Sequence, residues 1–143
     1  MNHKKIKVIF DTNVWISFLI GKRLTIIKGY ILNGNISIIT TPQLLQEITI
    51  VTQREKLQKY FQKEQVEVLI DLLSTIAENF EIKPQYLVCR DPKDNFLLDL
   101  IYFSEADFLV TGDKDLLEHN PFKTAKILTV SEFEKELENL HFK

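Results

Sequence analysis

The sequence has few residues that form cross-links. It contains a single cysteine, Cys89, among 143 residues. No intrachain disulfide can form, and one thiolate cannot make a zinc site with several sulfur ligands. This cysteine usage is typical of a reducing compartment, so we expect a cytoplasmic protein. No histidine is spaced to activate Cys89 as a nucleophile, and we expect a small buried residue there.

Long apolar runs and a strong charge imbalance are also absent. The apolar stretch 8–10 follows three lysines but stops at Asp11, which is too short for a signal peptide. No uncharged apolar run approaches the roughly 20 residues that a membrane helix needs. The net charge is −2, so the chain lacks the basic excess that lets a domain coat nucleic acid. A polyanion would have to be held by metal ions and a few local cations, and we expect no membrane contact.

What remains is the composition of one ordinary globular domain. Hydrophobic residues make up 45% of the chain and charged residues 27%. A chain of this length can bury a core without cross-links. We find no internal repeat, low-complexity segment or linker, so we expect a single domain over residues 1–143.

Strand-like and helix-like segments alternate along this chain. Apolar β-branched runs predict strands at 5–10, 36–40, 80–82, 107–110 and 125–129. Apolar periodicity and capping residues predict helices at 14–20, 24–32, 42–52, 96–105, one or two within 54–79, and a last one opened by a capping box from Ser131 to Glu134. Such alternation predicts an α/β fold, a three-layer α/β/α sandwich around four to five mostly parallel strands.

Acidic residues follow several of the predicted strands. Asp11 comes directly after the first strand, and Asp113 follows the strand 107–110. Glu47 lies on the second turn of the helix after the second strand, and Asp94 is placed to cap the helix 96–105. Ligands of open parallel sheets bind outside the carboxyl ends of the strands. The four acids can therefore converge on one edge.

Each acid also has a purely structural explanation. Asp11 and Asp94 are suitable helix N-caps, Asp113 and Asp115 are suitable turn residues, and a helical glutamate such as Glu47 is more often a solvated surface residue. These explanations do not account for so many acids at one edge. Clustered carboxylates repel one another unless a cation lies between them. Oxygen ligands without a His or Cys set favour Mg²⁺ or Mn²⁺ over zinc, and such a site suits phosphodiester cleavage by a metal-activated water.

Four segments of the sequence resemble one known family, the PIN domain, and in particular PIN nucleases of the VapC type, the toxins of toxin–antitoxin pairs. The four segments are Val8-Ile-Phe-Asp-Thr-Asn-Val14, Thr41-Pro-Gln-Leu-Leu-Gln-Glu47, Arg90-Asp-Pro-Lys-Asp-Asn95 and Asp107-Phe-Leu-Val-Thr-Gly-Asp-Lys-Asp-Leu-Leu117. They occur in the family's order, and the resemblance covers nearly the whole chain. The resemblance implies a Mg²⁺- or Mn²⁺-dependent endoribonuclease, an RNA substrate, an antitoxin protein as partner, and a homodimer.

The resemblance also implies roles for particular residues. It makes the four acids just described the catalytic and metal-binding cluster, and it gives Asn13 and Thr111 supporting hydrogen bonds. Two further acids rank below these: Asp115 would reach the metals through water, and Asp91 would shape its loop. Which RNA is cut and how many metal ions act are left open.

Two other functions fit parts of the pattern. An Asp after the first strand and a later Gly-Asp are also found in aspartyl-phosphate phosphatases, but those need a second Asp where this chain has Asn13. A non-catalytic PIN-like module that binds RNA or an antitoxin is the other alternative, although clustered charges cost stability without a metal.

A basic set in the middle of the chain has two readings as well. Its members, with two aromatic neighbours, are Arg54, Lys56, Lys59, Lys63, Tyr60 and Phe61. They could grip RNA through phosphates and stacked bases. We favour the other reading, a solvated helix whose aromatic side chains face the core.

Overall fold

The fold is organised around a five-stranded parallel sheet. The computed structural model describes residues 5–21, 24–85 and 94–139, with the side chains of 24–26 left out. The strands are β1 (Ile6–Phe10), β2 (Ile36–Thr40), β3 (Glu78–Asn79), β4 (Phe108–Val110) and β5 (Lys126–Leu128), in the order β3-β2-β1-β4-β5. Val8 of β1 pairs with Ile38 on one side and with Phe108 on the other. Every pairing between these strands is parallel, which agrees with the predicted, mostly parallel sheet.

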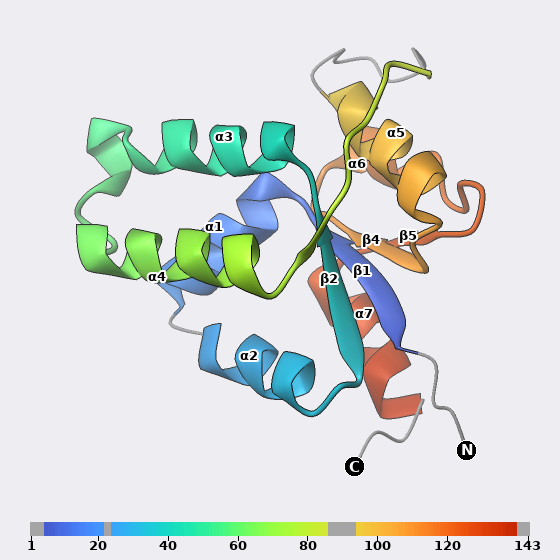
Figure 1. Ribbon diagram of the computed structural model, residues 1–143, viewed down its shortest axis with the longest axis horizontal. Helices are drawn as coiled ribbons and strands as arrows, with labels where there is room; N and C mark the ends of the chain where they lie inside the picture. Colours follow the sequence, from blue (N-terminus) through green and yellow to red (C-terminus); the bar gives the residue numbers. More distant parts are fainter. Residues whose placement is uncertain (1–4, 22–23, 86–93, 140–143) are drawn as a thin grey trace.

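Helices connect successive strands and lie around the sheet (Figure 1). They are α1 (Thr12–Ile20), α2 (Leu24–Leu32), α3 (Pro42–Thr52), the 3₁₀ turn η1 (Glu55–Leu57), α4 (Lys63–Thr75), α5 (Asn95–Ser104), α6 (Lys114–Leu117) and α7 (Val130–Asn139). Figure 1 shows α3 and α4 side by side, extending away from the edge of β2. None of the described helices is long and apolar enough to cross a membrane.

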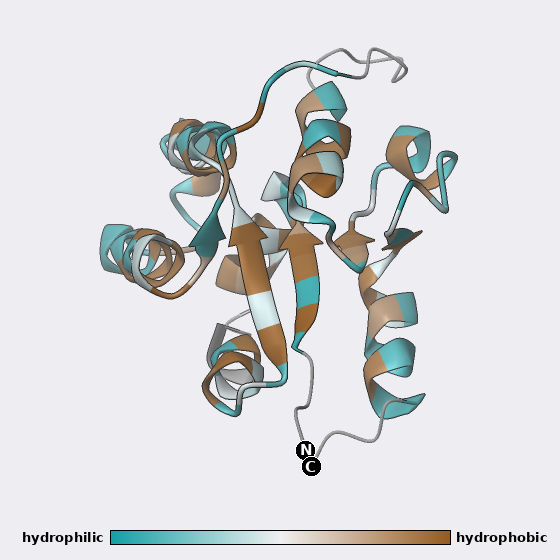
Figure 2. Ribbon diagram, turned by 45° about the vertical axis from the view of Figure 1, so that its right-hand side comes forward, coloured by the Kyte–Doolittle hydropathy of each residue, from teal (hydrophilic) through white to brown (hydrophobic). Residues whose placement is uncertain are grey.

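The sheet is covered on both faces. Side chains alternate along a strand, and Phe10 lies edge-on to the rings of Trp15 and Phe18 of α1 and Phe133 of α7. Lys7 projects to the opposite face, where its Nζ donates to the carbonyl of Ser104 at the end of α5, 3.2 Å away. The central strands β1 and β2 are mostly apolar, while the outer helix faces are polar (Figure 2). This arrangement is the predicted α/β/α sandwich.

Two predicted details of the secondary structure are wrong. The third strand is Glu78–Asn79 instead of 80–82, because β2 ends at Thr40, which pairs with Asn79. The capping box lies two residues earlier than Ser131: the carboxylate of Glu132 accepts from the backbone N–H of Thr129, whose hydroxyl accepts in turn from the backbone N–H of Glu132. The last strand already ends at Leu128, so α7 begins sooner than the sequence pattern suggested.

Candidate metal and catalytic site

The carboxylate of Asp11 is built into the junction between β1 and α1. The side chain is 5% exposed, and its Oδ1 accepts the backbone N–H of Val14 at 2.8 Å, which caps α1. The backbone N–H of Asp11 donates to the carbonyl of Val110 on β4, 3.1 Å away. Asp11 is therefore fixed at the carboxyl edge of the sheet, the edge where β1, β2 and β4 end and Asp11, Thr41 and Thr111 follow.

Thr111 links the two central strands at this edge. It follows β4, is fully buried, and donates its backbone N–H to the carbonyl of Leu128 at 2.9 Å. Its hydroxyl donates to Oδ2 of Asp11 and accepts the backbone N–H of Asp113 at 3.0 Å. Both carboxylate oxygens of Asp11 are thus held by hydrogen bonds, and Asp113 is connected to Asp11 through one side chain.

Asp113 adds a second negative charge beside Asp11. Its carboxylate is half-buried and caps the short helix α6 by accepting the backbone N–H of Asp115 at 2.9 Å. Burial raises the pKa of Asp11 above its ordinary value, and the charge of Asp113 raises it further, while hydrogen bonds from Thr111 and the α1 backbone act in the other direction. A cation at this position would favour ionised Asp11.

Glu47 and Asp94 belong to helices that begin at the same edge. In Figure 2, α3 starts where β2 ends, and α5 begins beyond the strand tips and runs back toward the sheet. Glu47 is half-buried on the second turn of α3. Asp94 occupies the N-cap position of α5 and is half-buried, but its side chain makes no capping hydrogen bond. The expected capping role of Asp94 is therefore wrong, and capping does not explain an acid at this position.

The donor set fits a hard divalent cation at the Asp11–Asp113 pair. Mg²⁺ keeps several waters and is commonly bound through one or two carboxylates, so the carboxylates of Asp11 and Asp113 are a sufficient protein contribution. Within residues 5–21, 24–85 and 94–139, no group of three or more His, Cys, Asp or Glu side chains is arranged to hold one metal ion. A single cluster that includes Glu47 and Asp94 stays a prediction.

The lower-ranked residues are placed less centrally. Asn13 is exposed on the first turn of α1, and its backbone N–H is among the groups that favour ionised Asp11. Asp115 is half-buried in α6 and contributes its backbone N–H to Asp113. Asp91 lies outside the described residues, as does Cys89.

The sequence reading missed one buried acid of α5. Asp99 lies on α5, is 3% exposed, and its Oδ1 accepts the backbone N–H of Gln85 at 2.8 Å. It thereby ties the chain after β3 to α5. A signal for it was present, because Asp99 is the one acid within the otherwise apolar run Phe96 to Tyr102.

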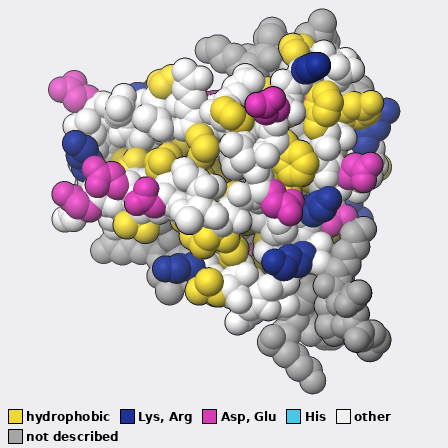
Figure 3. All heavy atoms as spheres, viewed as in Figure 1, with side chains coloured by type: hydrophobic (Ala, Val, Ile, Leu, Met, Phe, Trp, Pro, Cys, Tyr) yellow, Lys and Arg dark blue, Asp and Glu magenta, His cyan; other side chains and the backbone are white. Residues whose placement is uncertain are grey.

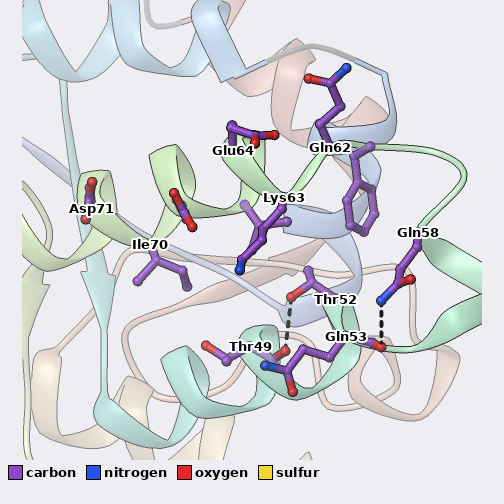
Figure 4. A pocket seen from close by; sticks show the side chains of 12 residues that line it. Thr49, Thr52, Gln53, Gln58, Gln62, Lys63, Glu64, Ile70 and Asp71 are labelled. Atoms are coloured by element: carbon purple, nitrogen blue, oxygen red, sulfur yellow. Dashed lines mark hydrogen bonds between the residues drawn. The ribbon is translucent and has the colours of Figure 1, made fainter.

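A separate cavity lies between α3 and α4. It measures about 860 Å³ and is lined by residues of α3, α4 and the segment between them, including Thr49, Gln53, Lys63 and Asp71. The side chain of Lys63 points into it (Figure 4). None of the four predicted site acids lines this cavity. This cavity is therefore separate from the predicted catalytic position.

The comparison with known families decides the identity of the fold. The family described as PIN domain matches residues 7–115, which run from β1 to α6. The chain belongs to the PIN-domain family. The matched range contains all four predicted site acids, and PIN domains are generally nucleases that typically use divalent metals. A nuclease-type function follows for this PIN domain at the level of the family.

A relative of this PIN domain is found in an archaeon. An uncharacterized protein of Methanocaldococcus jannaschii is 36% identical over 125 residues, which cover 82% of this chain and 77% of the relative. The similarity therefore extends over most of both proteins. It supports membership of the PIN-domain family and does not distinguish a toxin from other PIN nucleases.

Proposed function

We propose that this PIN domain is a metal-dependent endoribonuclease that hydrolyses RNA phosphodiester bonds at the carboxyl edge. The observation that carries the proposal is the buried carboxylate of Asp11, held beside the charge of Asp113 by Thr111. A buried carboxylate next to a second negative charge is energetically unfavourable, and acids perturbed in this way are often found at functional sites. A bound cation and a phosphate at this edge would provide such a use.

The chain's own residues have distinct tasks in this proposal. Asp11 and Asp113 would hold Mg²⁺ or Mn²⁺, and Glu47 and Asp94 would complete the acidic surroundings from α3 and α5. The ion would lower the pKa of a bound water and neutralise charge on the phosphate. Thr111 keeps Oδ2 of Asp11 in a fixed direction, while the backbone of α1 fixes Oδ1. No residue is required as a covalent nucleophile.

The finer biological role is part of the same proposal. The resemblance to VapC-type proteins supports a cytoplasmic toxin that is inhibited by an antitoxin protein and acts as a homodimer within a single domain of 143 residues. Induced expression in a bacterial host tests the toxin role. Growth should stop with the parent protein and continue with Asp11→Asn. Continued growth of cells that produce active nuclease would favour a housekeeping enzyme.

The decisive experiment is cleavage of a mixed RNA with Mg²⁺, Mn²⁺ or EDTA. Asp11→Asn and Asp94→Asn should each lower the cleavage rate by more than about 100-fold, since ligand loss should exceed the 10- to 100-fold effect of altering a ligand's hydrogen-bond partner. Asp71→Asn is a matched control, because Asp71 is exposed on α4 and lines the other cavity. Circular dichroism confirms that each variant is folded.

Other outcomes would contradict the proposal. Full activity in Asp11→Asn would remove the carboxylate pair from the mechanism. RNA binding in EDTA without cleavage in either metal would favour a non-catalytic binding module. Release of phosphate from a phosphomonoester without RNA cleavage would favour an aspartyl-phosphate phosphatase.

A further inference from the structure

The turn between α3 and α4 exposes three cations and one aromatic ring. Arg54, Lys56, Lys59 and Tyr60 are all exposed, and we call these four residues the tip patch. Glu55 is an exposed acid of the same turn, so the segment keeps a positive balance. The prediction that both aromatic residues face the core is half right, since Phe61 is buried and Tyr60 is not.

Tyr60 is presented in a way that suits stacking. Its side chain is 50% exposed, and Nζ of Lys59 lies 5.1 Å from the ring centroid. The ring borders a hollow of about 420 Å³ whose other lining residues are Gln58, Lys59, Phe61, Gln62 and Gln65. A base has a π-face for the ring and polar edges for amide side chains, while lysine binds phosphate. The hollow therefore has the chemistry of a nucleotide subsite.

The outer face of α3 connects this turn with the carboxyl edge. Gln43, Gln46 and Ile50 are exposed there at intervals of three and four residues, so they lie on one side of the helix. The single acid of α3, Glu47, is half-buried at the border of that face. With 11 residues, α3 spans about 16 Å at 1.5 Å per residue. A short single strand can cover that length.

The cavity between α3 and α4 is unsuited to a polyanion. Glu64, Glu67 and Asp71 of α4 line the cavity between the two helices together with Lys63. Acidic side chains gather over this helix in Figure 3. Their repulsion of phosphate would direct an RNA strand along the outer face of α3 and away from the cavity.

We propose that the outer face of α3 and the tip patch form a track for single-stranded RNA, which holds the substrate beyond the bond that is cut at the carboxyl edge. The inference rests on the proposed nuclease function, whose substrate it concerns. RNA is favoured over a protein partner because the exposed side chains of the track are cationic and amide groups around one aromatic ring. Its apolar members are Ile50 and the ring of Tyr60.

The first test measures binding without cleavage. A fluorescein-labelled, unstructured oligoribonucleotide is titrated with the Asp11→Asn protein in EDTA, and binding is followed by anisotropy. Adding Tyr60→Ala should weaken binding about tenfold, the loss typical of one stacked base. Tyr102→Ala is the matched control, because Tyr102 is 45% exposed on α5, outside the track. It should change the dissociation constant less than about twofold.

The second test uses the dependence of binding on salt. Each phosphate contact contributes a slope of about −0.7 in a plot of log K against log salt for single strands. The double variant Arg54→Gln/Lys56→Gln should therefore reduce the slope by about 1.4. Lys83→Gln/Lys135→Gln removes the same charge from exposed positions outside the track and should leave the slope nearly unchanged.

The outcomes separate the track from the nuclease proposal. Weaker RNA binding in Tyr60→Ala supports the track even where no metal gives cleavage. Equal binding by Tyr60→Ala and Tyr102→Ala, or no RNA binding by the parent protein, would overturn the track while Asp11-dependent cleavage could still be observed. Loss of a dimer in Tyr60→Ala, seen by sedimentation with RNA binding unchanged, would assign the surface to a protein contact and would also overturn it.

Discussion

The carboxyl edge and the α3–α4 hairpin present their functional groups in opposite ways. At the edge, Asp11 and Thr111 are buried and are fixed by hydrogen bonds to the backbone of β4, β5 and α1. At the tip patch, Tyr60 and the nearby cations are exposed on a 3₁₀ turn and its continuation. The sheet fixes the geometry of the side chains at the carboxyl edge, whereas the side chains of the tip patch are exposed on the surface. Substitutions should accordingly affect stability and activity together at the edge, and ligand binding alone at the tip.

The largest effect is expected from the core beneath the edge. Phe10→Ala removes a fully buried ring that contacts three other aromatic rings and should lower the free energy of unfolding by about 3–5 kcal/mol. Tyr60→Ala, an exposed counterpart, should change it by less than about 0.5 kcal/mol. Urea denaturation of both variants checks the contrast. Equal losses would mean that the two regions do not differ in this way.

The next effect concerns the hydroxyl between the two acids. Thr111→Val removes the donor to Asp11 and the acceptor of the Asp113 N–H, which should lower kcat/KM for RNA by about 10- to 100-fold. It should also destabilise the fold by about 1–3 kcal/mol, because buried polar groups lose their partners. Thr111→Ser keeps the hydroxyl and serves as the control. Equal activity of the valine and serine variants would exclude a positioning role.

The third prediction concerns pH and metal. The native pKa of Asp11 lies above its unfolded value near 3.8, so its contribution to stability is present below that pH and is lost as pH rises through the native pKa. In EDTA at pH 7, Asp11→Asn should therefore have the higher Tm, by several degrees if the difference exceeds about 1 kcal/mol. The gap should shrink toward pH 3, as thermal unfolding followed by circular dichroism at each pH would show.

Addition of a divalent metal should reverse the order of the two Tm values, so that the parent protein has the higher Tm. Mn²⁺ binds the native state and stabilises it in proportion to the logarithm of its concentration over Kd. The parent protein should gain Tm on addition of Mn²⁺, while Asp11→Asn should gain little. An equal gain in both proteins would place the ion elsewhere.

The smallest effect is expected at the exposed apolar position of α3. Ile50→Ala should leave both the unfolding free energy and kcat within experimental error, with a change in stability of less than about 0.5 kcal/mol, and should raise KM for RNA about twofold at most. Initial rates over a range of RNA concentrations measure this. A large loss of stability would contradict this prediction, because it would mean that the Ile50 side chain packs against another part of the protein.

Much of the fold could be predicted because local signals and burial agree. The strand Ile36–Thr40 and the helix Leu24–Leu32 occur as expected, since each is an apolar run that ends at a clear boundary. The capping box was misplaced because Thr129 and Ser131 are both followed three residues later by glutamate. The choice between them depends on where β5 ends, which is decided by pairing with β4.

The candidate site was predictable only in part. Acids directly after strands, such as Asp11 and Asp113, could be placed because parallel strands bring their carboxyl ends to one edge. The exposure of Tyr60 could not be predicted, since Tyr60 and Phe61 are adjacent and only the packing of the turn selects the one that is buried. The role of Asp99 depends on a contact with a residue 14 positions away, which no local pattern encodes.

The sheet ends on both sides in very short strands. β3 has two residues and β5 has three. Unpaired backbone groups of a long outer strand invite pairing with another chain, and short outer strands leave little length for it. A protein that associates with this one would therefore have to recognise helix surfaces through side chains, because extending the sheet by strand addition would gain only a few backbone hydrogen bonds.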